Sequence, residues 1–498
     1  MTLIEHVIGG ARTAGAGAER APVYNPATGE QAAEVVLGTP ADVNAAVMAA
    51  SKAAEGWAAT PPAKRAEVMF ALRDVMRRRR DDIADTISAE HGKTHADALG
   101  EVARALEVVE FACGIPHLLK GEFSRDVASG LDACAERQPL GVVAGITPFN
   151  FPAMVPLWMI PMALACGNAF ILKPSERDPS SANLIHDLCA EAGLPPGVLN
   201  VVHGDKTAVD ALLDHPGIAA ISFVGSTPVA EYIYGRGCAA GKRVQALGGA
   251  KNHMIILPDA DLDQAADALM GAGYGSAGER CMAISVAVPV GEETADRLVD
   301  KLAPRVAALK VGPPTDPESE MGPLITAAHR DKVAGFIGAG IREGAVAVVD
   351  GRGLTLQGYE NGFWLGGSLL DRVTPDMSVY REEIFGPVLS VVRAGSYDDA
   401  VAMINAHEYG NGTAIFTRDG DAARDFTRRI QVGMVGVNVP IPVPVGYHSF
   451  GGWKRSLFGA HGIYGPEAVH FYTRLKTVSA RWPTGIRAGA EYTFPSLG

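Results

Sequence analysis

Cysteine is scarce in this sequence, and no two cysteines lie close together along the chain. The six cysteines are spread through 498 residues, and none forms a CxxC motif. Disulfide-rich secreted domains and zinc sites both require denser or more regular cysteine spacing. The sequence therefore predicts reduced thiols in a cytoplasmic protein, and no metal site.

Positive charge is also in short supply. The chain has 44 Lys and Arg residues against 56 Asp and Glu residues, which gives a formal net charge of −12. An acidic surface repels the phosphate backbone of DNA and RNA. We therefore expect no nucleic-acid partner.

Targeting and membrane signals are missing as well. The N-terminus, MTLIEHVIGG, lacks the basic segment and apolar run of a secretory signal. Residues 153–172 carry no charge, but Pro156 and Pro161 interrupt this stretch and Gly167-Asn168 is typical of a turn. We expect a buried helix followed by a buried strand, and no membrane partner.

The middle of the chain alternates short apolar stretches with helical segments. Apolar strands that alternate with helices imply a parallel sheet covered on both faces, which is an α/β fold. A second α/β pattern begins near His253. The strands expected in the first pattern are 141–146, 169–172, 198–203 and 218–224, with helices near 181–192, 207–213 and 229–234.

The two ends of the chain differ from this middle. The first 120 residues are predicted to be mostly helical, with amphipathic candidates at 41–54 and 63–80. Residues 471–482, FYTRLKTVSARW, are typical of an exposed strand, which is an aggregation risk unless it is paired. Pairing with another subunit would remove that risk, so the sequence favours an oligomer.

The segment Gly278-Glu279-Arg280-Cys281 contains a candidate nucleophile. It closes a run of small residues, GAGYGSAG, that would let a ligand approach, and it precedes an expected strand. A cysteine beside a cation gains thiolate character, and the thiolate is the nucleophile. On these residues alone, a buried structural cysteine is the commoner interpretation.

Three further motifs lie where expected strands end, which is the edge of a parallel sheet that binds ligands. Asn150, in Thr147–Pro152, could donate an N–H to a developing oxyanion. Lys173 and Glu176 could bind ribose hydroxyls. The turn Phe223–Thr227 opens a helix whose amides suit a phosphate, although this turn lacks the GxGxxG fingerprint. Each motif can also be interpreted as a simple turn or helix cap.

Together, the order and spacing of these motifs resemble those of the aldehyde dehydrogenase superfamily over essentially the whole chain. The motifs are TPFNFP, KPSE, FVGST, the GERC segment and EEIFGP at 382–387. The resemblance implies a Rossmann-type NAD-binding domain at 1–120 and 140–247 and an α/β catalytic domain at 248–450. It also implies bridging segments at 121–139 and 451–498 that form a small β oligomerisation arm, and a homotetramer.

The resemblance also implies a role for each motif. Cys281 attacks the aldehyde carbon, and Asn150 and the Cys281 backbone N–H hold the oxyanion. Hydride then passes to the nicotinamide and leaves a thioester. Because a carboxylate at Glu176 would repel a 2′-phosphate, the cofactor is expected to be NAD. The residues expected to contact NAD are Thr147, Phe149, Lys173, Glu176, Arg177, Ser226, Gly248, Glu383 and Phe385.

One segment departs from the superfamily pattern. Most members carry a glutamate general base where this chain has Ala246, within QALGGAKNH. An alanine cannot accept a proton, so the thioester should persist until a thiol such as coenzyme A attacks it. This departure, with GERCMA and NVPIPVPVGYHSFGGWKRS, resembles the CoA-acylating methylmalonate-semialdehyde dehydrogenase branch, which usually has glutamine in place of Glu279.

The resemblance to that branch predicts the reaction. It implies NAD- and CoA-dependent oxidative decarboxylation of methylmalonate or malonate semialdehyde to propionyl-CoA or acetyl-CoA, as in valine, β-alanine or inositol breakdown. The substrate carboxylate suits arginine, and Arg104 and Arg280 are the candidates. Two alternatives stay open: a hydrolytic dehydrogenase that yields a free acid, with Glu279 as base, and a non-catalytic scaffold that keeps the fold.

Overall fold

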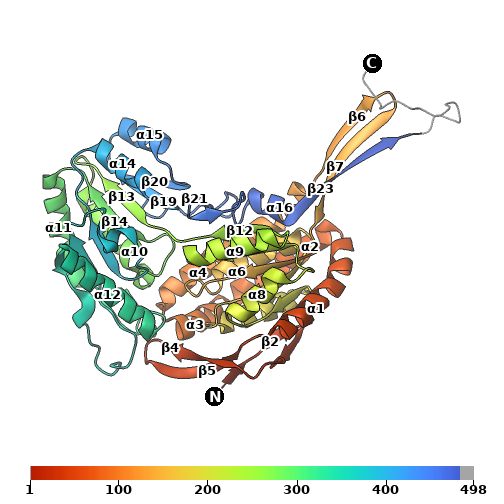
Figure 1. Ribbon diagram of the computed structural model, residues 1–498, viewed down its shortest axis with the longest axis horizontal. Coiled ribbons are helices and arrows are strands. Elements are labelled where there is room, and N and C mark those ends of the chain that lie inside the picture. The colour runs from red at the N-terminus through yellow and green to blue at the C-terminus, as the bar shows by residue number, and fades with distance from the viewer. Residues whose placement is uncertain (1, 483–498) are drawn as a thin grey trace.

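The computed structural model describes residues 2–482, which form two large β-sheets, three small ones and the helices around them (Figure 1). The first large sheet has eight strands in the order β22-β12-β11-β8-β9-β10-β2-β3. Its parallel centre contains four strands that the sequence predicted and one more. These are β8 (Val142–Ile146), β9 (Ala169–Lys173), β10 (Leu199–Val201), β11 (Ala220–Val224) and β12 (Arg243–Leu247).

Helices cover both faces of this sheet. Successive side chains of each strand point to opposite faces, so apolar residues of one strand pack against helices on both sides. Ala144 of β8 lies in a buried cluster with α1 (Pro40–Ala59), α8 (Lys206–Asp214) and α9 (Thr227–Ala239). Its neighbour Val143 lies in a second cluster on the other face. That cluster includes residues of α2 (Pro62–Arg78), α3 (Arg80–His91), α4 (His95–Cys113), α6 (Met154–Ala165) and α7 (Ser180–Glu191).

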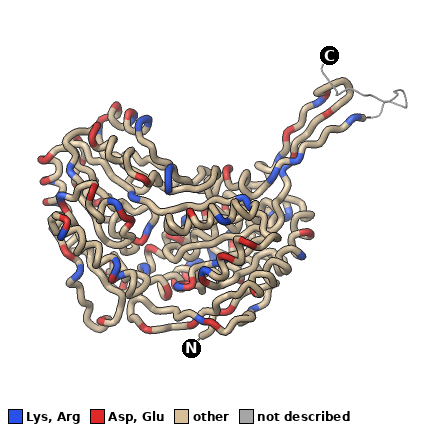
Figure 2. Tube along the Cα trace, in the orientation of Figure 1, with Lys and Arg blue, Asp and Glu red and all other residues tan. Residues whose placement is uncertain are grey.

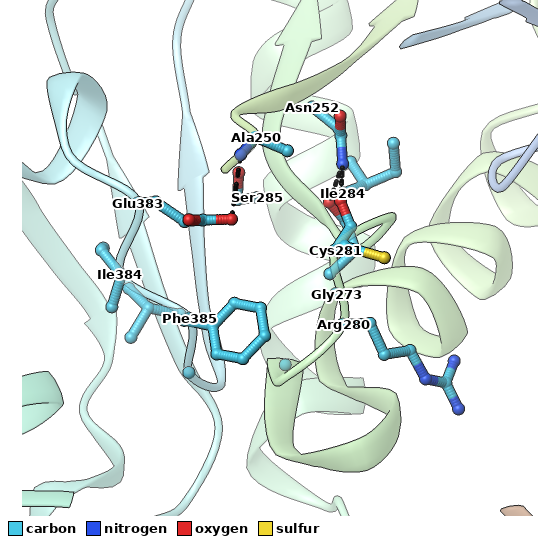
Figure 3. A pocket seen from close by; sticks show the side chains of 14 residues that line it. Ala250, Asn252, Gly273, Arg280, Cys281, Ile284, Ser285, Glu383, Ile384 and Phe385 are labelled. Carbon is cyan, nitrogen blue, oxygen red and sulfur yellow. Dashed lines mark hydrogen bonds between the residues drawn. The ribbon is translucent and has the colours of Figure 1, made fainter. Parts of the chain in front are cut away.

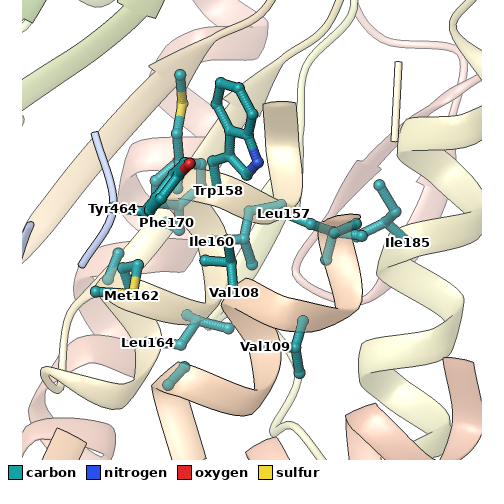
Figure 4. Close-up of a cluster of buried hydrophobic side chains, with 14 of the residues drawn as sticks. Val108, Val109, Leu157, Trp158, Ile160, Met162, Leu164, Phe170, Ile185 and Tyr464 are labelled. Atoms are coloured by element: carbon teal, nitrogen blue, oxygen red, sulfur yellow. The ribbon is translucent and has the colours of Figure 1, made fainter. Parts of the chain in front are cut away.

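Helix α6 lies at the centre of the second cluster and is buried along its whole length (Figure 4). Its Trp158 packs against Phe450 and Tyr464, with ring centroids 4.9 and 5.1 Å apart. The uncharged stretch 153–172 thus forms a buried helix and then the buried strand β9, as predicted. No helix within residues 2–482 has the length and hydropathy needed to cross a bilayer.

The prediction of a mostly helical N-terminal segment is wrong for residues 2–36. The segment contains β1 (Thr2–Ile4), β2 (His6–Ile8), β3 (Ala11–Thr13), β4 (Arg20–Asn25) and β5 (Glu30–Val36). Strand β2 pairs with β10, about two hundred residues later, at Val7 and Val201. Short strands of this kind are stabilised by distant partners, which a local hydrophobic period does not reveal.

The second large sheet has seven strands in the order β15-β16-β17-β14-β13-β19-β20 and begins at Asn252, close to the expected His253. Its strands are β13 (Asn252–Ile256), β14 (Ile284–Pro289), β15 (Val346–Val349), β16 (Ser368–Asp371), β17 (Val388–Val391), β19 (Gly412–Phe416) and β20 (Met434–Val437). Around it lie α10 (Leu262–Tyr274), α11 (Glu292–Ala307), α12 (Ala327–Glu343), α14 (Tyr397–Ala406) and α15 (Gly420–Arg429).

A three-stranded sheet projects from the body as an arm (Figure 1). It consists of β6 (Glu122–Ala128), β7 (Leu131–Pro139) and β23 (Thr473–Arg481), and residues of both charges occur along it (Figure 2). The exposed strand predicted at 471–482 is therefore present from Thr473 onward, while Phe471 and Tyr472 end α16 (Pro466–Tyr472). Within the predicted segment 451–498, β22 (Leu457–Phe458) pairs with β12 instead, and residues 483–498 lie outside the described part.

Candidate active site

Cys281 lies in a short connection between α10 and β14. The turn before it, Gly275–Gly278, places Ser276 and Ala277 at positive φ of 54° and 52°. A Cβ at Gly278 would come within 2.1 Å of the Gly386 carbonyl oxygen, so only glycine lets the EEIFGP segment lie against this turn. The run Gly273–Gly278 has GxGxxG spacing, but it ends a helix instead of following a strand and is not a nucleotide fingerprint.

Two asparagines hold the backbone of the nucleophile. The Nδ2 atoms of Asn252 (Figure 3) and Asn411 donate to the Cys281 carbonyl oxygen at 2.9 and 3.0 Å. Asn252 begins β13, and Asn411 directly precedes β19. Neither residue was predicted as a site residue, because a side-chain amide that holds a backbone carbonyl cannot be recognised without its spatial neighbours, even in Asn252, which lies in QALGGAKNH.

The pKa of the Cys281 thiol moves in the direction opposite to the one that its neighbour Arg280 suggested. Burial and, to a smaller extent, the negative charge of Glu383 together raise this pKa to about 12. The Arg280 guanidinium donates to Asp97 of α4 at 2.5 Å, so an acidic partner already neutralises its charge. Adjacency in sequence therefore did not predict the electrostatics of the thiol.

Asn150 points its amide toward the same connection. Its Nδ2 donates to the Glu279 backbone carbonyl at 2.9 Å, and the side chain is buried. An asparagine amide carries two protons, and one bond to Glu279 uses only one of them. The arrangement therefore leaves an N–H that could donate to an oxyanion formed beside Cys281.

Glu279 is fully buried, and its carboxyl group lies between the imidazoles of His329 and His91. Oε1 accepts from the Ile325 backbone N–H at 3.3 Å and lies 3.5 Å from His329 Nε2, while Oε2 lies 3.7 Å from His91 Nε2. Burial raises the pKa of Glu279 to about 8, so the carboxyl is mostly protonated at neutral pH. Among the described residues, the hydrogen-bond and ion-pair contacts of this carboxyl are with Ile325, His329 and His91, and none is with Cys281.

The residues expected to contact the cofactor gather around one cavity of about 700 Å³. Cys281 and Asn150 line it together with Thr147, Phe149, Lys173, Glu176, Arg177, Ser226, Gly248, Glu383 and Phe385. These residues come from the ends of several strands of the first sheet and from the second sheet. The structure thus brings together all of the sequence-predicted site residues except Arg104 and Arg280, which are absent from the lining of this cavity.

One end of the cavity has the features of a nucleotide site. Lys173 Nζ lies 3.3 Å from a carboxylate oxygen of Glu176. Ser226 is the N-cap residue of α9, and the Thr227 hydroxyl accepts from the Gly249 backbone N–H at 2.8 Å. Backbone amides at a helix N-terminus favour a phosphate, and a carboxylate favours ribose hydroxyls.

Aromatic rings line the cavity nearer the cysteine. The Phe149 and Phe385 rings meet edge to face at 5.9 Å, and His329 packs against both rings at 6.2 and 6.3 Å. The Arg177 guanidinium also contacts this cluster, because it lies over the Phe149 ring, 5.1 Å from the ring centroid. His329, on α12, was missed by the sequence analysis, although it belongs to this wall.

Glu383 joins the aromatic wall to the glycine segment. Its Oε1 accepts from the Ala250 backbone N–H at 3.0 Å (Figure 3), and burial raises its pKa to about 7. A Cβ at Gly249 would come within 2.4 Å of the Glu383 carboxylate. The absence of a side chain at Gly249 therefore permits this close approach.

Two of the expected site positions have other neighbours. Ala246 is buried within β12, where it pairs with Phe223 of β11 and Phe458 of β22, and it offers no proton acceptor. Arg104, on α4, is bound by Glu107 at 2.8 Å and donates to the backbone carbonyls of Val443 and Pro444. Arg104 thus ties helix α4 to the proline-rich loop before the C-terminal region.

The site therefore combines a half-buried thiol, an adjacent amide donor, an aromatic wall and a nucleotide-like end in one cavity. A dinucleotide would fit this order: phosphate at the N-terminus of α9, ribose at Glu176 and Glu383, and a ring beside Phe385. Bound in this order, a dinucleotide would bring a ring that accepts hydride into the cavity that Cys281 also lines.

Comparisons with known proteins agree with this geometry. Residues 13–478 match the model of the aldehyde dehydrogenase family. The malonate-semialdehyde dehydrogenase of Pseudomonas aeruginosa is 60% identical over 100% of both chains. The mitochondrial acylating methylmalonate-semialdehyde dehydrogenase of Arabidopsis thaliana is 46% identical over 97% of this chain and 80% of its own.

Solved structures are equally similar. The NAD complex of a Sinorhizobium meliloti protein assigned as a methylmalonate-semialdehyde dehydrogenase superposes with a TM-score of 0.97 at 59% identity, over 98% of this chain and 99% of the other. A methylmalonate-semialdehyde dehydrogenase from Oceanimonas doudoroffii gives a TM-score of 0.96 at 57% identity, over 97% and 99% of the two chains. The α/β fold expected from the sequence is thereby confirmed, and the chain belongs to the aldehyde dehydrogenase family.

Proposed function

We propose that this enzyme oxidises methylmalonate semialdehyde and malonate semialdehyde with NAD and coenzyme A, releasing CO₂ and forming propionyl-CoA or acetyl-CoA. The observation that carries the proposal is Ala246, which leaves the expected position of a hydrolytic base without a carboxylate. The names of the full-length relatives support the substrate class.

Cys281 begins the proposed reaction. As a thiolate, its sulfur attacks the aldehyde carbon, and the resulting oxyanion accepts hydrogen bonds from Asn150 Nδ2 and from the Cys281 backbone N–H. The two asparagines on the Cys281 carbonyl keep the backbone of the nucleophile in place during this step. When bound, NAD supplies the acceptor for the hydride that leaves the former aldehyde carbon, and Cys281 is left as an acyl thioester.

The cavity residues would hold NAD in one orientation, with its adenosine end at Glu176 and its nicotinamide end at Phe385. Lys173 and Glu176 would bind the adenosine ribose, and the α9 N-terminus at Ser226 would bind the pyrophosphate. Glu383 would bind the nicotinamide ribose, with Phe385 beside the ring. Thr147, Phe149, Arg177 and Gly248 would complete the lining of the cavity.

The absence of a hydrolytic base decides the fate of the thioester. The β-carboxylate leaves as CO₂, the electron pair of the broken C–C bond forms an enolate with the thioester carbonyl, and the enolate takes up a proton. The CoA thiolate then attacks the acyl carbon, and Cys281 departs as a thiolate. Glu279, the base that hydrolysis would require, faces His91 and His329 instead.

Arg280 and Arg104 are the proposed carboxylate-binding residues. In the structure, Arg280 forms an ion pair with Asp97, and Arg104 forms one with Glu107. Binding of a substrate carboxylate would therefore exchange one acidic partner for another, which limits the cost of desolvating the arginines.

We further propose a cytoplasmic homotetramer whose arms take part in assembly, and the domain boundaries inferred from the family pattern. The arm exposes Phe123, Leu475 and Val478, which are large apolar side chains that a partner subunit would cover. The breakdown of valine, β-alanine or inositol is the metabolic setting that fits this reaction.

A steady-state assay with both semialdehydes, with and without CoA, tests the proposed function. The expected result is NADH formation that depends on CoA, with the acyl-CoA product identified by mass spectrometry. NADH formation at the full steady-state rate without CoA, accompanied by a free acid, would instead establish the hydrolytic alternative. Failure to bind NAD in a calorimetric titration would point to the non-catalytic scaffold.

A further inference from the structure

A lysine that belongs to none of the cofactor or substrate motifs lies directly behind Asn150. Lys93 follows α3 and its C-cap residue Gly92, and its side chain is fully buried. Its Nζ donates to the Asn150 backbone carbonyl at 2.7 Å and lies 4.1 Å from the Phe151 ring centroid. The ammonium group therefore contacts the Asn150–Phe151 segment from both its polar and its aromatic side.

The partner of this lysine is an equally buried glutamate on α4. Glu101 Oε2 accepts from Lys93 Nζ at 2.7 Å, and both side chains have 0% exposure. Glu101 Oε1 accepts from the backbone N–H groups of Ala153 and Met154, at 2.9 Å each. Helix α6 begins at Met154 and has no side-chain cap of its own, so Glu101 serves as the cap from another helix.

The ion pair thus forms hydrogen bonds with the backbone at Asn150 and with the backbone three and four residues after it. Lys93 holds the carbonyl of residue 150, and Glu101 holds the N–H groups of residues 153 and 154. The Asn150 side chain makes its own bond to the Glu279 carbonyl, beside the nucleophile. With the backbone held on one side and the amide on the other, the free N–H of Asn150 has little room to move.

We propose that the buried Lys93–Glu101 pair is a positioning pair that aims the Asn150 amide at the oxyanion of the substrate. This inference rests on the role proposed above for Asn150. A buried ion pair is a poor source of net stability, because the cost of desolvating two charges cancels most of their attraction. Its observed contacts point instead to fixed geometry, and an oxyanion donor works only when its position is fixed before the reaction.

Kinetics of single and double variants test the proposal. Removing an oxyanion donor typically lowers kcat by about 10²- to 10³-fold, and Lys93→Met should lower kcat by about 10- to 100-fold because Asn150 is misplaced and not removed. Since Lys93 acts through Asn150, adding Lys93→Met to Asn150→Ala should cause no further loss of kcat. The dissociation constant for NAD should stay unchanged in all of these variants.

Glu101→Gln tests the same proposal from the other member of the ion pair. It preserves the shape of the side chain and an acceptor oxygen but removes the charge, so the result does not depend on whether Lys93→Met folds. The matched control is Arg393→Met, which breaks another largely buried pair, with Asp371 at 2.7 Å, on the second sheet. Arg393→Met should lower stability without lowering kcat at a temperature where the protein remains folded.

The outcomes separate this inference from the proposed function. If Asn150→Ala leaves kcat unchanged, Asn150 is not the oxyanion donor and the proposed mechanism is wrong at that residue. Suppose instead that Asn150→Ala lowers kcat, and that adding Lys93→Met or Glu101→Gln lowers kcat again by its full single-variant factor. The pair then acts elsewhere, and the positioning inference is overturned. Non-additive losses with unchanged NAD affinity support it.

Discussion

Glu383→Gln should increase the reactivity of Cys281 in the enzyme without cofactor. The pKa of the Cys281 thiol is raised from 9.0 to about 12, first by burial and then by the charge of Glu383. Because one pKa unit is a factor of ten in thiolate, about a thousandfold less thiolate is present near pH 8 than in an ordinary cysteine. Glu383→Gln removes the smaller of these two contributions to the thiol pKa, so it should speed alkylation of Cys281 by about 3- to 10-fold.

The pH dependence of this effect follows from the second titrating group. The pKa of Glu383 is about 7, so its carboxylate is charged above that pH and neutral well below it. A charged Glu383 opposes formation of the thiolate, whereas a neutral one does not. The ratio of the Glu383→Gln rate to the wild-type rate should therefore be close to one near pH 6 and should grow above pH 8.

Alkylation by iodoacetamide, followed peptide by peptide with mass spectrometry, measures this ratio. Cys238 is exposed and serves as an internal reference in every sample, while Cys113, Cys166 and Cys189 are buried. Wild-type Cys281 should react far more slowly than Cys238 at pH 8. If Cys281 without cofactor reacts as fast as Cys238, or if Glu383→Gln slows the reaction, the electrostatic argument is refuted.

Three further perturbations have defined outcomes. Cys281→Ala should abolish steady-state NADH formation while NAD still binds, and continued NADH accumulation in this variant would exclude the thioester mechanism. Glu176→Gln should raise the ratio of the NADP to the NAD specificity constant by about tenfold, because a carboxylate that repels a 2′-phosphate is removed; an unchanged ratio would place the ribose elsewhere. Trp158→Ala should lower the free energy of unfolding by about 3–5 kcal/mol in a urea titration, since it leaves a cavity between Phe450 and Tyr464, whereas a loss below 1 kcal/mol would mean that the core closes over it.

The features that the sequence predicted correctly are those encoded by neighbouring residues. Strands such as Val142–Ile146 and Ala220–Val224 are runs of apolar residues, and their boundaries were predicted to within one or two residues. The motifs at strand ends, with Asn150 and Lys173, could be found because parallel strands bring their carboxyl ends to the same edge of a sheet. The lack of a proton acceptor at Ala246 was also visible, although only the resemblance to the aldehyde dehydrogenase family marks this as the position of an expected base.

Contacts between residues far apart along the chain were decided only by the tertiary structure. The N-terminal strands depend on partners such as Val201, and Arg280 is paired with an aspartate 183 residues away. The carboxyl of Glu279 faces two distant histidines, and the Lys93–Glu101 pair meets Asn150 across a gap of 57 residues. Charge and hydrogen bonding act through space over a few ångströms, so adjacency in sequence determines which residues are available, while the fold determines which of them act on one another.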